Sequence, residues 1–246
     1  MSANTAGPGR TVRPEGEVRP GPARGRAFGA GPLARAAALV YTLLVTEGLL
    51  LLTSAPGLVP LLLLRADASN LPLDAACLVP AGPAASAALF ALWRRSGDLA
   101  DLHPAAAFWR GYRLNAAGVL RLYVPWLAGA TMVAMALAHG PASGVPGWWR
   151  ALLVVIVAAG TLWLANAMVI TSLFAFRAAD VARLAAYFLG RTPLVALGNA
   201  GVVIAGALVT AFATEPVALL FAAVGCLALL ASSRPLIKQV KERFTA

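Results

Sequence analysis

The sequence predicts an all-α fold: a polytopic transmembrane helix bundle of about six spans, with both termini in the cytoplasm and short cytoplasmic interfacial helices. Three observations lead to this prediction. Of the 246 residues, 60% are hydrophobic and only 12% are charged, whereas about a quarter of the residues of a soluble domain are charged. Several apolar runs along the chain have a length close to the ~20 residues that are needed to cross a bilayer. Basic residues gather in every second link between these runs, following the positive-inside rule.

The two ends of the chain differ from its apolar middle. Residues 1–30 are rich in Gly, Pro and Arg and lack apolar periodicity, so we expect a disordered basic cytoplasmic tail. The length of this tail favours an uncleaved first span over a secretory signal. Residues 31–238 are expected to form the transmembrane domain, and residues 239–246 a cytoplasmic C-terminal tail.

The first two spans contain prolines that should interrupt their helices. The first span covers about residues 36–64, and two prolines predict that its helix ends near Ser54, with a bent segment beyond, because proline removes a hydrogen bond and clashes with the preceding turn. The second span covers about residues 71–93. Within it, Pro80 and Pro83 predict a kink or a broken helix.

The third and fourth spans follow a segment that combines aromatic and basic residues. This segment, residues 108–113, predicts a short interfacial helix, because aromatic rings beside arginine suit the headgroup region. The third span then covers about residues 114–138, with a kink at Pro125. The fourth covers about residues 147–176 and is longer than a ~30 Å bilayer core requires, so we expect tilt or protrusion into the cytoplasm.

A short amphipathic helix is predicted between the fourth and fifth spans. Asp180 is its expected N-cap, and Arg183 and Tyr187 fall on the face opposite an apolar stripe. Such a helix suits an in-plane position at the cytoplasmic interface. The apolar stripe consists of Val181, Leu184, Ala185 and Phe188.

The last two spans are predicted to be antiparallel neighbours. The fifth covers about residues 193–213 and the sixth about residues 216–233, and only the turn at residues 214–215 separates them. With the N-terminus inside, 18 of the 20 Lys and Arg residues fall on the cytoplasmic side, and Arg65 and Arg150 are the exceptions. This asymmetry supports both the orientation and the count of six.

Composition and topology exclude several classes of function. The net charge of +10 is explained by cytoplasmic loops facing anionic lipid, so the lipid bilayer, and not nucleic acid, is the expected partner. His103 and His139 fall on opposite sides of the membrane and cannot share a site. Cys77 and Cys226 lie in apolar runs with no metal-binding spacing. No catalytic motif occurs, so we expect neither enzymatic activity nor a cofactor; the oligomeric state stays open.

Four polar residues within the spans form the candidate functional site. Glu47 lies about 16 Å into the first span at about 1.5 Å per residue, and Asn166 lies at a similar depth in the fourth. Arg121 lies a few turns into the third span from the same side, and Asn199 about two turns into the fifth. They are predicted to form one intramembrane polar cluster in the inner half of the bundle. In one alternative, Glu47 is a packing residue and the asparagines join helices. In the other, the cluster couples to an ion or substrate, since an intramembrane acid is a functional candidate by default.

One stretch of the chain resembles a known family. The segment Leu78–Arg95, LVPAGPAASAALFALWRR, is followed by Phe108-Trp109-Arg110 and by Asn115. This pattern is similar to the YesL-like family of bacterial multi-pass membrane proteins of unknown function. The resemblance implies the bacterial plasma membrane and an accessory or regulatory role in carbohydrate uptake, with carbohydrate importer subunits as partners.

A second function, from a different class, follows from the residues themselves. A small transporter or permease-like subunit would use a mid-membrane polar site around Glu47. Against this, the inward-facing loops lack the Glu-Ala-Ala…Gly motif by which sugar-importer permeases dock their ATPase, and residues 178–190 are only faintly similar to it. This comparison favours the accessory role.

Overall fold

The computed structural model describes residues 31–64, 67–95, 103–139, 146–212 and 221–244, which form helices and no strand. The long helices are α1 (Pro32–Leu63), α4 (Pro104–His139), α5 (Gly147–Leu173) and α7 (Pro193–Phe212). The shorter ones are η1 (Ala68–Asn70), α2 (Leu71–Leu78), α3 (Ala81–Trp93), α6 (Ala178–Arg191), α9 (Ala222–Ser232) and α10 (Arg234–Phe244).

Several of these helices are long and apolar enough to cross a membrane, as expected of a membrane protein. Four within the described residues meet this criterion: α1, α4, α5 and the Pro193–Thr210 part of α7. The segment from η1 to α3 gives a fifth candidate, which bends by 41° at the break between α2 and α3. Pro80 lies in this break, so the predicted interruption of the second span is confirmed, and its cause is the missing amide and the ring of proline.

The first helix is longer than predicted. We expected it to end near Ser54, but α1 continues to Leu63 with Pro56 and Pro60 inside it. Packing against α2 explains the difference: a Cβ at Gly57 would overlap the Cys77 carbonyl oxygen, so the two backbones are in direct contact. This contact stabilises a helical conformation that proline alone disfavours.

The start of α4 also differs from the prediction. No separate interfacial helix forms over residues 108–113, because α4 is continuous for 36 residues, about 54 Å at about 1.5 Å per residue. Phe108 is fully buried against the alanines of α3, and Gly111 lies against Phe90. These contacts direct the start of α4 along α3, not into the plane of an interface.

Two amphipathic helices pack against the end of α5. The amphipathic helix predicted to begin at Asp180 is confirmed as α6, although Arg177 is its N-cap and Asp180 lies in its first turn. The boundary predicted at residue 238 falls inside a second such helix, α10. Apolar residues of both helices share one core with α5, and these are Val181, Ala185, Phe188, Leu236, Ile237 and Val240.

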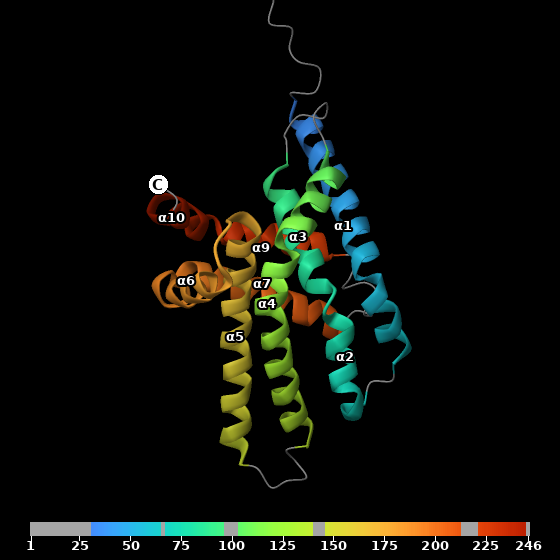
Figure 1. The fold of residues 1–246 in the computed structure, drawn as a ribbon, viewed down its shortest axis with the longest axis vertical. Coiled ribbons are helices and arrows are strands. Elements are labelled where there is room, and N and C mark those ends of the chain that lie inside the picture. The colour runs from blue at the N-terminus through green and yellow to red at the C-terminus, as the bar shows by residue number, and fades with distance from the viewer. Residues whose placement is uncertain (1–30, 65–66, 96–102, 140–145, 213–220, 245–246) are drawn as a thin grey trace, which may run out of the picture.

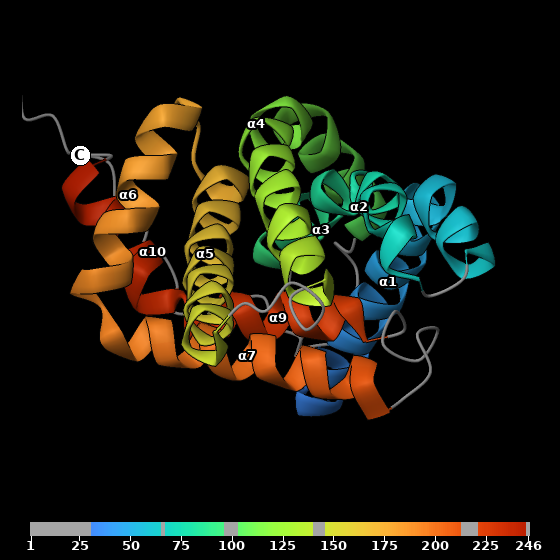
Figure 2. The ribbon, with the colours of Figure 1, turned by 90° about the horizontal axis from the view of Figure 1, so that it is seen from below.

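The described helices include four or five candidate spans, not all of which run in one direction. In Figure 1, α4 and α5 run vertically, whereas α7 and α9 lie across them, and the view from below in Figure 2 shows the same crossing. Where the sixth span was predicted, the described part is α9, with 11 residues, or about 16 Å against the ~30 Å of a bilayer core. Residues 213–220, which include the predicted turn and the start of that span, lie outside the described residues.

Candidate functional site

Glu47 contacts the beginning of α9. Its Oε2 atom accepts a 2.6 Å hydrogen bond from the backbone N–H of Ala223, in the first turn of that helix. The first amides of a helix have no acceptor within the helix, and a carboxylate at this end is also favoured by the helix dipole. Glu47 therefore acts as an N-cap that α1 supplies to α9.

The two asparagines meet near the other end of α9. The Asn199 side chain of α7 donates from Nδ2 to Oδ1 of Asn166 in α5, at 2.9 Å. The Oδ1 atom of Asn199 accepts a hydrogen bond from Ser232 at 2.6 Å and a longer one from Ser233 at 3.4 Å. Both asparagines are buried, so this network joins α5, α7 and the end of α9 through groups removed from solvent.

The four predicted residues do not form one cluster. Ala223 and Ser232 are nine residues apart along α9, so the contacts of Glu47 and Asn199 are separated by about 14 Å. Arg121 is exposed on α4 and forms no ion pair with Glu47. The structure thus brings Asn166 and Asn199 together, places Glu47 at the opposite end of α9, and leaves Arg121 on the surface.

The two serines of this network were not predicted as site residues. Ser232 and Ser233 directly follow the apolar residues of α9. This pair of hydroxyl groups after an apolar run is the one sequence feature from which the contact could have been predicted. A second polar contact was also missed. Ser86 and Ser172 share a 2.8 Å hydrogen bond, and Asn115 donates to the Ser172 carbonyl at 3.2 Å, which joins α3, α4 and α5.

Part of the Glu47 side chain has no described partner. Its Oε1 atom is buried and receives no hydrogen bond within the described residues, and the same holds for the Thr46 hydroxyl beside it and for Ser54 two turns further along α1. A buried polar atom without a partner costs free energy. This unpaired oxygen is the feature of the site that a packing role leaves unexplained.

The polar contacts of these residues hold helices together. Within the described residues, no three His, Cys, Asp or Glu side chains are grouped closely enough to bind one metal ion. His103 directly precedes α4 and His139 ends it, so the whole length of that helix lies between them. The contacts of Glu47, Asn166 and Asn199 are those of residues that position α9.

The fold and this site define a helical protein whose apolar helices are joined by buried polar contacts. Comparisons with models of known protein families, with curated proteins and with solved structures found no significant match. The resemblance of residues 78–115 to the YesL-like family therefore stays a prediction from the sequence.

Proposed function

We propose that this chain is a multi-pass protein of the bacterial plasma membrane that serves as an accessory or regulatory component of carbohydrate uptake. The YesL-like resemblance suggests the process, and the polar contacts of the bundle support an accessory role over a transporting one. The observation that carries the proposal is the use of Glu47 and Asn199 to fix the two ends of α9. Side-chain atoms that already bond one helix to another are not available to bind a solute.

The distribution of basic residues supports the orientation that the proposal requires. Arg94 and Arg95 end α3, Arg110 lies near the start of α4, and all three line one pocket, so they share one end of the bundle. Basic residues are retained on the cytoplasmic side of bacterial membrane proteins. We therefore place this end in the cytoplasm, and the topology predicted from the sequence puts α6 and the C-terminal segment on the same side.

The exposed face of α6 is the surface we assign to the importer subunits. Its apolar face is buried in the core, and Trp163 of α5 donates a hydrogen bond to the Ala182 carbonyl at 3.0 Å. Asp180, Arg183 and Tyr187 are exposed and line a groove of about 490 Å³. A fixed helix with a charged outer face is suited to binding a protein partner at the membrane surface.

Affinity purification of the tagged full chain from its native membrane tests this role. We expect carbohydrate importer subunits to copurify, and we expect Arg183→Glu combined with Tyr187→Ala to reduce their recovery several-fold, since aromatic and arginine side chains dominate interface energetics. Arg150→Glu is the matched control, because it makes the same charge change at the opposite end of α5. Recovery of the chain without any importer subunit would contradict the accessory role.

The unpaired Glu47 oxygen supports one alternative, a small transporter with an ion-coupled site. Solute flux by the purified protein in liposomes separates the two functions. The accessory role predicts no flux, and it predicts that Glu47→Gln still copurifies with importer subunits. Flux that Glu47→Gln abolishes at unchanged membrane abundance would establish the transporter instead.

A further inference from the structure

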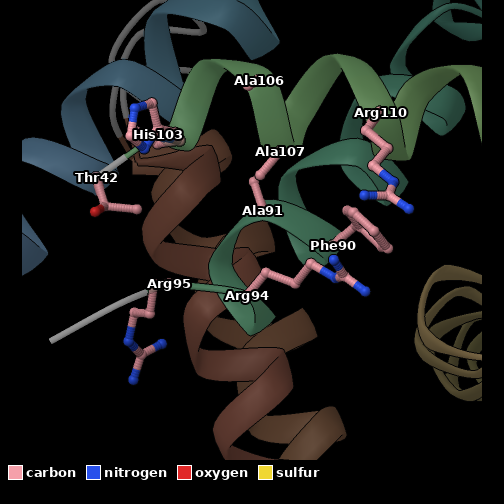
Figure 3. Close-up of a pocket in the computed structure, with 10 residues that line it drawn as sticks. Thr42, Phe90, Ala91, Arg94, Arg95, His103, Ala106, Ala107 and Arg110 are labelled. Atoms are coloured by element: carbon pink, nitrogen blue, oxygen red, sulfur yellow. The ribbon is translucent and has the colours of Figure 1, made fainter. Parts of the chain in front are cut away.

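The break between α2 and α3 separates a loosely packed helix from a firmly packed one. No residue of α2 is buried, whereas nine of the thirteen residues of α3 are. Contacts with α4 hold α3 at both ends. At its start, a Cβ at Gly82 would overlap the Tyr123 ring, and near its end Figure 3 shows Ala91 beside Ala107. The 41° bend of the second span therefore coincides with a change in packing.

The backbone at this break lacks the regular hydrogen bonds of a helix. Pro80 has no amide to donate, and the Gly82 amide bonds only three residues back, to the Val79 carbonyl, at 3.4 Å. In a continuous helix that amide would bond to the Leu78 carbonyl. The Leu78 carbonyl accepts instead from the Tyr123 hydroxyl of α4, at 3.3 Å. This bond is longer than the ~2.7–2.8 Å typical of hydroxyl donors, so it holds α2 to α4 weakly.

The end of α1 has a weak point opposite this break. Pro56 and Pro60 each remove one hydrogen bond from the helix. Gly57 directly follows the first of them, and its backbone contacts the Cys77 carbonyl of α2. The contact lies after Pro56 in α1 and before Pro80 in the second span, so it joins α2 to the end of α1 on one side of both prolines. Figure 1 shows these two segments together, at the end of the molecule away from α10.

We propose that α2 and the end of α1 beyond Pro56 move as one unit relative to α3, with hinges at Pro56 and Pro80. The hydrogen bond from the Tyr123 hydroxyl to the Leu78 carbonyl is the contact that breaks when the unit moves. Hinge motions occur at a few positions while the packed helices beside them stay intact, and the fixed part here is the core shared by α3, α4 and α5.

This motion would change one end of the molecule and leave the other in place. In the topology predicted from the sequence, the moving unit lies at the outer surface of the membrane. The candidate residues around α9 belong to other helices, apart from Glu47, which precedes the Pro56 hinge by more than two turns. The hinge does not depend on the role in carbohydrate uptake.

Distances between paired spin labels, measured by double electron–electron resonance on the full chain in nanodiscs, test this proposal. Labels replace the exposed residues Leu73 on α2 and Val155 on α5, after substitution of the two native cysteines by alanine. We expect two distances in the otherwise unmodified chain. Tyr123→Phe should raise the proportion of the minor distance about threefold, because it removes one weak hydrogen bond.

Two controls separate a hinge from a general loosening of the bundle. Tyr112→Phe makes the same change three turns earlier on α4, within the Phe108 cluster, and should leave the two distances as they are. A second label pair, which replaces Trp93 on α3 and Val155 on α5, should give one distance in every variant, since both helices belong to the fixed core.

A further variant covers the case in which Tyr123→Phe does not fold. Pro80→Ala supplies an amide that can bond to the Ala76 carbonyl and stiffens the break, so we expect the α2 pair to show one distance. A single α2 distance shared by the unmodified chain and Tyr123→Phe would overturn the proposal. Two distances that respond to neither substitution, or an equal response to Tyr112→Phe or in the α3 pair, would overturn it as well.

Discussion

At the scale of single residues, polar side chains inside the bundle form hydrogen bonds that hold one helix to another. Glu47 accepts from a backbone amide of another helix, and Asn199 both donates to Asn166 and accepts from Ser232. Each contact satisfies a group that would otherwise be unpaired in an apolar environment. These hydrogen bonds offset part of the cost of placing polar residues in apolar helices, while Glu47 Oε1 and Asn166 Nδ2 have no partner within the described residues.

The asparagine pair gives a quantitative prediction. We expect Asn199→Leu to lower the free energy of unfolding by about 1–2 kcal/mol, because it removes the described partner of Asn166 and one of the two acceptors of Ser232. In a double-mutant cycle with Asn166→Leu, the coupling should lie near the ~0.6–1.7 kcal/mol measured for interhelical hydrogen bonds in membranes. Unfolding in mixed micelles measures both quantities.

Thr210 lies on the same helix as Asn199 and provides a control substitution. The Thr210 hydroxyl is exposed and, among the residues that the structure describes, bonds to the Gly206 carbonyl of α7 itself, so Thr210→Ala should change stability by less than about 0.5 kcal/mol. Strict additivity of the two asparagine substitutions would show that their side chains do not interact.

At the scale of elements, local sequence determined some helices and tertiary contacts determined others. Pro80 breaks the second span as predicted, and the spacing of apolar residues located α6. The continuity of α1 past Pro56 and of α4 through Phe108 was not predictable, because it depends on packing against α2 and α3. Propensity describes a segment in isolation, whereas these helices are stabilised by partners distant in sequence.

The contact between α1 and α2 is testable through a glycine pair. Gly57→Ala places a methyl group onto the Cys77 carbonyl oxygen, and backbone displacement of this kind costs about 1–3 kcal/mol. Gly48→Ala on the same helix meets no atom within 4 Å and should be neutral or stabilising by up to about 1 kcal/mol. The thermal unfolding midpoint should fall in Gly57→Ala and stay unchanged or rise in Gly48→Ala. Equal midpoints for the two variants would contradict the α1–α2 packing.

At the scale of the whole molecule, the membrane class was predictable and the arrangement of the helices was not. Hydropathy alone predicted long apolar helices, and four or five of the described ones fit that class. The crossing of α7 and α9 over the other helices (Figures 1 and 2) has no counterpart in the hydropathy pattern, which carries no information on helix orientation. Depth along the chain also misled the site prediction, since it grouped Glu47 with Asn166 and Asn199 in the inner half of the bundle, although the length of α9 separates the contact of Glu47 from those of the asparagines.

Amide hydrogen exchange of the full chain in nanodiscs tests most directly whether Glu47 fixes the start of α9. Glu47→Leu removes the acceptor of the Ala223 amide, so exchange should become faster in residues 221–226 and stay unchanged in the Asn199-bound end of the helix. Glu47→Gln, which keeps an acceptor oxygen, should show a smaller effect. Unchanged exchange in residues 221–226 of Glu47→Leu would contradict the account.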